Sequence, residues 1–297
     1  MNGCAPAQGR TIFRCSPVKE NTTKFRILVL QMEVTAATAL AIGLAGGVLG
    51  GLMGLGGGII MIPLLTFDAG SNPYLYQSAS LLAAIAVSIG SIPRHVRSGM
   101  IDRPFVLRSL ILSLPSVAAS ALTSALVSSP RTLELLFAVF LALVGMSEIA
   151  GLFAQTKETA VPPPARNTWP RAMLIGGCMG TLSGLLGVGG GIVALPMIRT
   201  LVRFDIRTAI ATTAVLVLPT VIVGGLVRLA VASHTTSADG QPMTALSILI
   251  LALLLSPGCL VGGALGASLV HRLPHAILEC FFGVACLTFA ARMLGLF

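Results

Sequence analysis

Charged side chains are scarce in this sequence: only 10% of its 297 residues are Asp, Glu, Lys or Arg. A soluble domain carries charges on about a quarter of its residues. The shortage excludes an ordinary soluble enzyme, a coiled coil and a disordered chain. Because apolar runs of about 20 residues recur along the whole length, the sequence predicts an all-α polytopic membrane protein.

Cysteine patterns typical of metal sites are also missing. The six cysteines form no CxxC pair and no spacing with histidine that suits a metal. Four of them lie within apolar runs, where a thiol usually packs as a small hydrophobe. We therefore predict no metal site and no cofactor.

Acidic residues number 10 against 19 basic ones, which gives a formal net charge of +9. The basic residues lie in short loops between apolar runs, as in Arg94–Arg108 and Arg199–Arg207, which is how membrane topology is encoded. This distribution argues against a nucleic-acid partner. Five further basic residues fall in a polar leader, 1–31, and we interpret Met32 as the true start.

Glycine, in contrast, is abundant at 33 residues, and it is clustered in Gly43–Gly58 and Gly176–Gly191. Overlaying the clusters at a constant offset of 133 residues aligns GVLGGLMGLGGGIIMIPLL with GTLSGLLGVGGGIVALPMI, with ten identities in nineteen positions. The segments SALTSALVSSP and GALGASLVHRLP near the ends of the halves also correspond. These matches indicate an internal duplication. The predicted domains are a first transmembrane repeat at 32–153, a proline-containing linker at 154–171 and a second transmembrane repeat at 172–297.

Eight apolar runs divide between the repeats, and the glycine clusters interrupt the first run of each. The sequence therefore predicts about eight transmembrane or re-entrant helices. In the first repeat the loop after the glycines lacks basic residues and the next loop is rich in them, whereas the second repeat shows the reverse order. Opposite charge on equivalent loops predicts that the two repeats are inverted in the membrane.

The glycine motifs lack the residues of a nucleotide site. A Walker loop needs Lys and then Ser or Thr after its last glycine, but Ile59–Ile60 and Ile192–Val193 follow here. A dinucleotide fingerprint needs a soluble βαβ unit, which this chain does not offer. We therefore predict no nucleotide partner.

Three consecutive glycines weaken a helix by about 1 kcal/mol each relative to alanine, and we predict that they break it. Close helix packing explains the outer glycines of each cluster but not these three. A half-helix that starts after the glycines presents unpaired N–H groups and a positive dipole end. Two such ends predict a binding site for a small anion. Its candidate ligands are Gly56, Gly57, Gly58, Gly189, Gly190 and Gly191.

Polar residues on the following helices extend the candidate site. Ser80 and Thr213 occupy equivalent positions in the two repeats, and Thr212 precedes Thr213. Their hydroxyls can donate to an oxyanion or, as the alternative, bond to the helix backbone. Arg94 and Arg228 lie near equivalent helix ends, where a topology charge is the favoured interpretation over anion attraction.

Acids inside membrane helices are candidates for ion coupling. Glu134 and Glu279 lie in equivalent places just inside the last helix of each repeat, and they are possible coupling residues. A solvated position at the membrane interface is the alternative, and it is favoured. His95 and His271 neighbour arginines in predicted loops, and we expect no special role for either.

The paired motifs GLMGLGGGIIMIPLL and GLLGVGGGIVALPMI resemble those of the TauE/SafE sulfite-exporter family, also called the toluene sulfonate uptake permease family. The resemblance extends to SGMID after the second helix, ATT at 211–213 and GGALGASLVHRLP, and it covers essentially everything after Met32. It implies a multi-pass transporter of the inner (cytoplasmic) membrane for small sulfur-containing or organic anions, including sulfite, sulfonates and sulfoacetate. One departure is Ala79–Ser80, where the family usually has a Thr-Ser pair.

These observations predict a secondary transporter with the lipid bilayer and a small anion as its partners. The expected substrate is a sulfur-containing oxyanion or an organosulfonate, carried by alternating access between the repeats. A passive anion channel with the same glycine site is the alternative. A membrane-embedded enzyme is disfavoured, because no acid, histidine and nucleophile converge on equivalent apolar segments.

Overall fold

Helices make up the regular structure throughout the part of the chain that the computed structural model describes. The described ranges are 35–70, 72–97, 99–126, 130–155, 169–232, 244–270 and 275–294. The predicted leader 1–31 and most of the predicted linker 154–171 lie outside them. All described helices belong to the unit Val34–Phe297.

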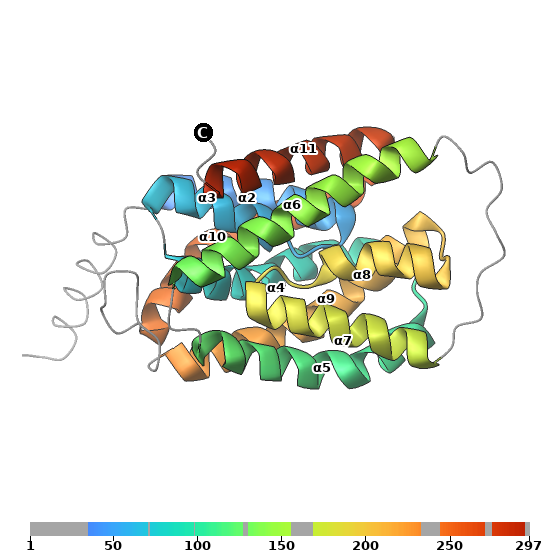
Figure 1. The fold of residues 1–297 in the computed structure, drawn as a ribbon, viewed down its shortest axis with the longest axis horizontal. Helices are drawn as coiled ribbons and strands as arrows, with labels where there is room; N and C mark the ends of the chain where they lie inside the picture. The colour runs from blue at the N-terminus through green and yellow to red at the C-terminus, as the bar shows by residue number, and fades with distance from the viewer. Residues whose placement is uncertain are drawn as a thin grey trace, which may run out of the picture. The chain divides into compact units, whose positions relative to one another are not determined.

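Two successive series of helices follow each other along the chain (Figure 1). The first series contains α2 (Ala36–Met53), α3 (Gly58–Ala69), α4 (Pro73–Arg97), α5 (Arg103–Leu126) and α6 (Pro130–Gln155). The second contains α7 (Trp169–Leu186), α8 (Gly191–Met197) with its π-helical continuation η1 (Ile198–Val202), α9 (Ile206–Val231), α10 (Ala245–Leu269) and α11 (His275–Met293).

Short polar side chains begin several of these helices. The Thr35 hydroxyl accepts the Thr38 N–H at 3.2 Å at the start of α2, and the Asp205 side chain accepts the Arg207 N–H at the start of α9. A side-chain oxygen in this position satisfies an N–H group that the first helical turn leaves without a partner. These caps explain where the apolar runs become helical.

Five described helices are long and apolar enough to cross a membrane, namely α2, α4, α5, α9 and α10. Two shorter apolar helices, Gly58–Ala69 and Gly191–Val202, follow the glycine clusters. Large apolar side chains point outward: Leu107 of α5 is 66% exposed and Leu253 of α10 is 73% exposed. Such surfaces suit contact with lipid, and the prediction of an all-α polytopic membrane protein is confirmed.

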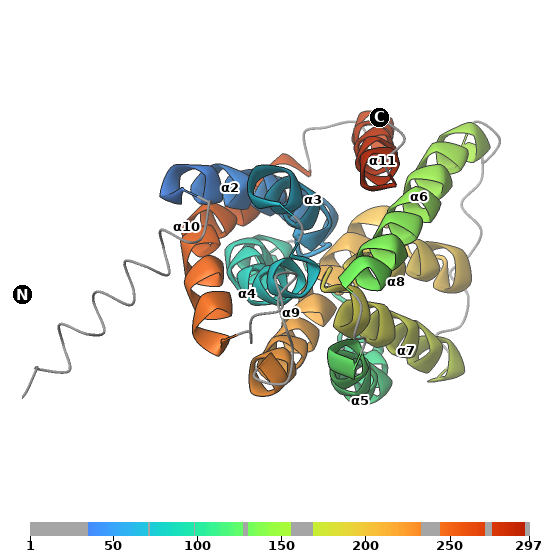
Figure 2. The same ribbon diagram turned by 60° about the vertical axis from the view of Figure 1, so that its left-hand side comes forward.

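Each helix series packs one of its long helices, α5 or α10, against the helices of the other series (Figure 2). Helix α10 of the second series lies against α2 and α4 of the first, and α5 of the first series lies against α7 and α9 of the second. Helices α6 and α11, the last of each series, pack against each other. Neither series therefore forms its own helix bundle, since each needs a helix from the other.

Glycines permit the closest of these helix contacts. Gly43, Gly47 and Gly51 of α2 face the backbone of α10, where a Cβ on Gly47 would lie 2.8 Å from the Cys259 carbonyl oxygen. Gly176, Gly180 and Gly184 of α7 face the backbone of α5 in the same manner. Small residues at such spacing let membrane helices approach closely, so packing does account for the outer glycines. The inversion of the repeats in the membrane stays a prediction.

This contact predicts different outcomes for two alanine substitutions on α7. A Cβ at position 180 would overlap the Ser113 backbone carbonyl, whereas at position 177 it would meet the flexible Leu112 side chain at 3.0 Å. We expect Gly180→Ala to destabilise the protein by about 1–3 kcal/mol through overpacking. Gly177→Ala, with the same gain in helix propensity, is the matched control and should be near neutral. The thermal midpoint of the purified protein in detergent checks this, and equal midpoints for the two variants would contradict it.

Candidate functional site

Each glycine motif breaks its helix in the same way. Gly54, at the end of α2, adopts φ of 68°, and Gly187, its equivalent after α7, adopts 74°. The loops continue with positive φ at Gly56, Gly57, Gly189 and Gly190. Because L side chains are strained at such angles, these positions require glycine. The predicted helix breaks are therefore observed in both motifs, with matching backbone conformation.

The two broken helices contact each other at the break. A Cβ on Gly58, the first residue of α3, would lie 2.9 Å from the Gly187 carbonyl oxygen of the other motif. Reciprocally, a Cβ on Gly191, the first residue of α8, would lie 2.6 Å from the Gly54 carbonyl oxygen. Each half-helix thus begins against the loop of the other repeat. The six glycines predicted to form the site are brought together in this way.

The short helices α3 and α8 start without help from side chains. Gly57 and Gly190 occupy their N-cap positions, and neither helix has a side-chain hydrogen bond at its cap. The Gly57 carbonyl accepts the N–H groups of Ile60 and Met61. The N–H groups before these have no acceptor within the helix, so both starts combine donors with a positive dipole end.

The three predicted hydroxyls have different surroundings. Ser80 Oγ lies 2.7 Å from the Gly187 carbonyl oxygen and so bonds across to the break of the other repeat. Thr212 Oγ1 accepts the Asp102 N–H at 3.3 Å, which links the start of α5 to α9. Thr213 Oγ1 is fully buried and has no hydrogen-bond partner. Ser80 therefore uses its hydroxyl donor within the protein, whereas Thr212 acts only as an acceptor in its bond and Thr213 makes no hydrogen bond.

Arg228 is a buried residue, so its interpretation as a topology charge is wrong. Its side chain has 0% exposure. Its Nε and Nη2 atoms donate to the Gly184 carbonyl, and Nη2 also donates to the Leu185 carbonyl at 2.9 Å. These carbonyls lie in the last turn of α7, where no helix donor reaches them. Arg228 therefore caps the carbonyl end of the broken helix.

The remaining bonds of Arg228 go to neutral groups on α4. Nη1 donates to Ser78 Oγ at 3.3 Å, Nη2 donates to Gln77 Oε1 at 3.2 Å, and the guanidinium lies 5.1 Å from the Tyr74 ring centroid. Among the described side chains, no carboxylate pairs with it. The positive charge of Arg228 is consequently solvated by dipoles but not neutralised.

Three buried donors near the breaks also have no recorded acceptor: Gln77 Nε2, Ser183 Oγ and Thr213 Oγ1. Gln77 adjoins Gly187, since its carbonyl oxygen lies 2.6 Å from a Cβ placed there, and Ser183 adjoins Gly190 in the same way. An unpartnered buried polar atom costs roughly 1–3 kcal/mol. The breaks therefore lie among groups that favour a hydrogen-bond acceptor.

His95 is the counterpart of Arg228 in the first repeat, and its assignment to a loop is wrong. It lies within α4, is only 4% exposed, and its Nε2 is 3.4 Å from the Gly51 carbonyl oxygen. The offset of 133 residues pairs His95 with Arg228 and Gly51 with Gly184. Equivalent side chains thus bond to equivalent carbonyls at the two breaks.

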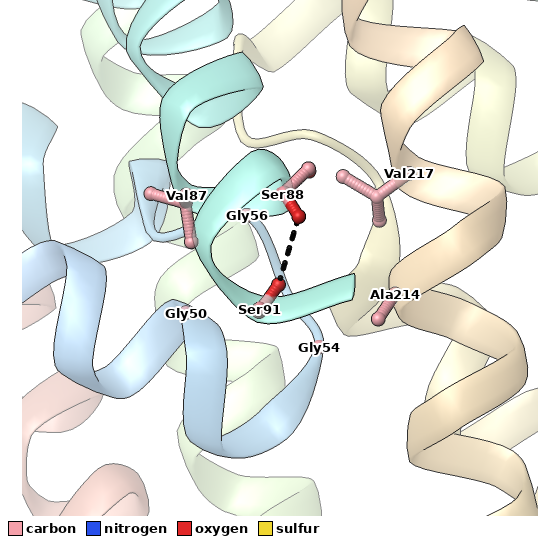
Figure 3. A pocket seen from close by; sticks show the side chains of 8 residues that line it. All are labelled: Gly50, Gly54, Gly56, Val87, Ser88, Ser91, Ala214 and Val217. Carbon is pink, nitrogen blue, oxygen red and sulfur yellow. Dashed lines mark hydrogen bonds between the residues drawn. The ribbon is translucent and has the colours of Figure 1, made fainter. Parts of the chain in front are cut away.

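A pocket opens beside the first break, with an empty volume of about 150 Å³ (Figure 3). Besides glycines of the first motif, Ser88 and Ser91 of α4 and Ala214 and Val217 of α9 line it. The Ser91 hydroxyl donates to the Ser88 carbonyl at 3.4 Å. The space is narrow and lies between the first glycine motif, α4 and α9.

Of the two possible coupling acids, the structure describes the side chain of Glu134. Glu134 is half-buried on α6, a helix that packs mainly against α11. The Glu279 side chain and His271 lie outside the described part of the chain. The roles predicted for the two acids therefore stay predictions.

The sequence contained one signal for the groups that it failed to assign. At the repeat offset of 133, Arg228 falls on His95, two basic side chains at one position of a duplicated apolar helix. Gln77 and Ser183 have no polar equivalents, because Ile210 and Gly50 occupy the corresponding positions. Only the structure could identify these two.

Comparison with known proteins supports the resemblance. The model of the family described as Sulfite exporter TauE/SafE matches residues 39–293. The chain is similar to the probable membrane transporter protein MamO of Magnetospirillum gryphiswaldense, with 25% identity over 280 residues. That match covers 84% of this chain and 43% of the relative, so the chain spans less than half the length of that protein.

Two further relatives match over more of their own length. The probable membrane transporter protein YunE of Bacillus subtilis is 25% identical, over 79% of this chain and 88% of the relative. The probable membrane transporter protein MJ0441 of Methanocaldococcus jannaschii is 30% identical, over 63% of this chain and 70% of the relative. No solved structure matches the chain. With a family match across most of its length and the multi-pass helical fold, the chain belongs to the Sulfite exporter TauE/SafE family.

Proposed function

We propose that this protein is a secondary transporter that moves a small anion across the cytoplasmic membrane by alternating access. The relatives are named as probable membrane transporters, and the family description supports a sulfur oxyanion or an organosulfonate as the substrate. The observation that carries the proposal is the fully buried, unneutralised guanidinium of Arg228 beside the paired helix breaks.

Electrostatics supports an anion rather than a cation or a neutral solute. A buried charge is costly unless an opposite charge or dipoles compensate it. Arg228 has only neutral acceptors around it, and the starts of α3 and α8 add two positive dipole ends. A cation at this place would be repelled, whereas an anion would neutralise Arg228.

The unpartnered donors support an oxyanion in particular. Gln77, Ser183 and Thr213 each offer a donor that lacks an acceptor. An ionised sulfite or sulfonate group carries three oxygens that only accept, so it can satisfy several such donors at once. Apolar solutes cannot do so.

Contacts between the two repeats support alternating access. Gly58 and Gly191 each rest on the loop of the other repeat, and these reciprocal contacts lie at the centre of the proposed site. A relative movement of the repeats about these contacts would open the site on one side at a time. The narrow pocket beside the first break lies between α4 of the first series and α9 of the second, so such a movement would change its width.

Uptake into proteoliposomes tests the function. We expect purified protein to drive saturable uptake of labelled sulfite, with competition by thiosulfate and sulfonates and less by carboxylates. Accumulation against a gradient distinguishes a secondary transporter from a passive channel, because a channel only equilibrates its ion. Uptake that never exceeds equilibrium under an imposed proton or sodium gradient would favour the channel, and absence of any anion flux would refute both.

Removal of the Arg228 charge should weaken anion recognition. A unit charge within roughly 10 Å, at an effective dielectric constant of about 20, contributes about 1.7 kcal/mol, so we expect Arg228→Gln to raise the KM for sulfite at least about tenfold. Arg228→Lys keeps the charge and should retain most of the affinity. Arg228→Lys should lower the thermal midpoint, because lysine lacks the planar set of donors with which Arg228 bonds to the Gly184 and Leu185 carbonyls.

Arg207→Gln provides the control for this series. Arg207 lies on the same helix but is exposed near its start, so its removal should leave the KM within about twofold. KM is measured at constant pH on proteoliposomes with matched protein content. Equal KM values for Arg228→Gln and Arg207→Gln would exclude Arg228 from the site.

The glycine loops should be required for transport even where the protein still inserts. Gly57 has φ of 79° and lies against the Gly46 carbonyl, whereas Gly70 has the same φ of 79° with nothing within 4 Å of an added Cβ. Gly57→Ala therefore combines backbone strain with a clash. Gly70→Ala adds strain without a clash, about 1–3 kcal/mol, because ψ of −175° puts Gly70 in a region that essentially only glycine adopts. We expect uptake to be lost in Gly57→Ala and retained in Gly70→Ala, as measured after confirming membrane insertion. Normal uptake by Gly57→Ala would contradict the loop's role.

A further inference from the structure

We propose that His95 carries the coupling proton of this transporter, an inference that rests on the proposed anion transport. Its place in the first repeat is the one that Arg228 occupies in the second. His95 Nε2 lies 3.4 Å from the Gly51 carbonyl oxygen, and Arg228 donates to the equivalent Gly184 carbonyl. The second repeat therefore has a permanent positive charge at its break, where the first has a side chain that can gain or lose one.

The bond to Gly51 fixes the role of one ring nitrogen of His95. A carbonyl oxygen only accepts, so His95 Nε2 must carry hydrogen in this contact. Uptake of a second proton by the ring then gives His95 a positive charge. The contact with the end of α2 is kept in both charge states, so protonation changes the charge at the break without dismantling it.

A polar face of α4 joins His95 to the break. Ser88, Ser91 and His95 follow each other at helical spacings of three and four, which puts them on one face. Both serines line the pocket beside the first glycine loop (Figure 3). His95, one turn further along α4, bonds to Gly51 of α2. His95 therefore shares its side of α4 with the two serines that line this pocket.

The second repeat lacks this polar face. At the repeat offset, Val221 replaces Ser88 and Gly224 replaces Ser91, so that Arg228 is the one polar residue of the three on α9. Leu81, which is fully buried, stands in place of the pocket residue Ala214. The serines beside the break are therefore a feature of the first repeat, where the histidine is found.

We compared His95 with the charged and titratable groups on the helices around α4. Helix α2 has none, and Cys259 is the one titratable residue of α10. The described charges on α3, α6 and α9 are Asp68, Arg131, Glu134, Arg207 and Arg228; Glu148 of α6 has its side chain outside the described part. On α4 itself, Arg94 and Arg97 are exposed. Arg228 is the fully buried member of this set, and arginine does not titrate near neutral pH.

The transport cycle then balances charge and protons. On one side of the membrane a proton binds to the His95 ring and the anion binds at the break; on the other side the anion leaves and the same proton is released. Arg228 alone neutralises one negative charge, and Arg228 with protonated His95 neutralises two. One proton moves with each anion in the same direction, and anion affinity rises as the pH falls through the range in which histidine is protonated.

Two substitutions of His95 fix its charge in opposite states. His95→Arg mimics the second repeat and should give a low KM that does not change between about pH 6 and about pH 8, the interval in which histidine titrates. His95→Gln keeps a donor for Gly51 and should give a high, equally constant KM. The wild type should change roughly tenfold between these two levels, as expected for gain or loss of a nearby charge. Sulfoacetate and thiosulfate are the probes, because neither changes its own charge in this interval.

Proton movement supplies an independent measurement. A pH dye trapped in the proteoliposomes should record anion-dependent proton entry with the wild type and none with either His95 variant, while anion exchange between the two sides continues in both. Glu134→Gln is the matched control and should keep the wild-type pH profile. Should one His95 variant fail to fold, the other still decides.

The outcomes separate this proposal from the transport function. Anion-driven proton entry or an unchanged pH profile in His95→Arg or His95→Gln would overturn it, as would loss of the pH profile in Glu134→Gln alone. If the wild type carries neither probe and exchanges no sulfite, the proposed function fails first. If it carries them without proton entry, transport stands and the coupling role of His95 is refuted.

Discussion

A helix that breaks inside a membrane leaves backbone groups with no water to bind, and most of this structure can be understood from that constraint. Each motif of three glycines creates one break, which leaves carbonyls at the end of one half-helix and N–H groups at the start of the next. Side chains of the protein bond to the carbonyl ends: Arg228 bonds to the end of α7, and His95 bonds to the end of α2. The N–H ends, at Gly58 and Gly191, have no side-chain cap. The asymmetry supports the proposed site, because a bound anion supplies what these starts lack.

The same constraint explains why the repeats are interlocked. A broken helix cannot stand against lipid, so backbone near the break must be covered by protein on every side. Helix α10 of the second series covers α2, and α5 of the first covers α7, each through glycines that admit backbone contact. Exchange of these helices brings the two breaks face to face. A single repeat would expose its break, which gives a physical reason for the duplication.

Sequence reasoning reached the breaks but not the groups that stabilise them. Three adjacent glycines are disfavoured in a helix whatever surrounds them, so Gly56–Gly58 and Gly189–Gly191 could be recognised from local chemistry alone. Thr213 and Ser80 were found through the repeat offset. Arg228 was misjudged, because a basic residue near the end of an apolar run has the same local pattern whether it faces water or the protein interior. The burial of Arg228 depends on α4 and α7, which are distant from it in sequence. The unpartnered donors of Gln77 and Ser183 could not be predicted for the same reason.

The differences between the repeats are as informative as their likeness. Equivalent glycines share positive φ angles and reciprocal contacts, so the backbone frame is nearly the same in both halves. Side chains on that frame differ at most positions of α4 and α9, and three of the differences lie beside the breaks: His95 against Arg228, Ser88 against Val221, and Ala214 against Leu81. In a transporter built of two equivalent halves, a symmetric frame allows both states, and unlike side chains must decide which state a proton or an anion favours. The proposed coupling residue, His95, is one of these unlike residues, and its contact with Gly51 connects it to the first break.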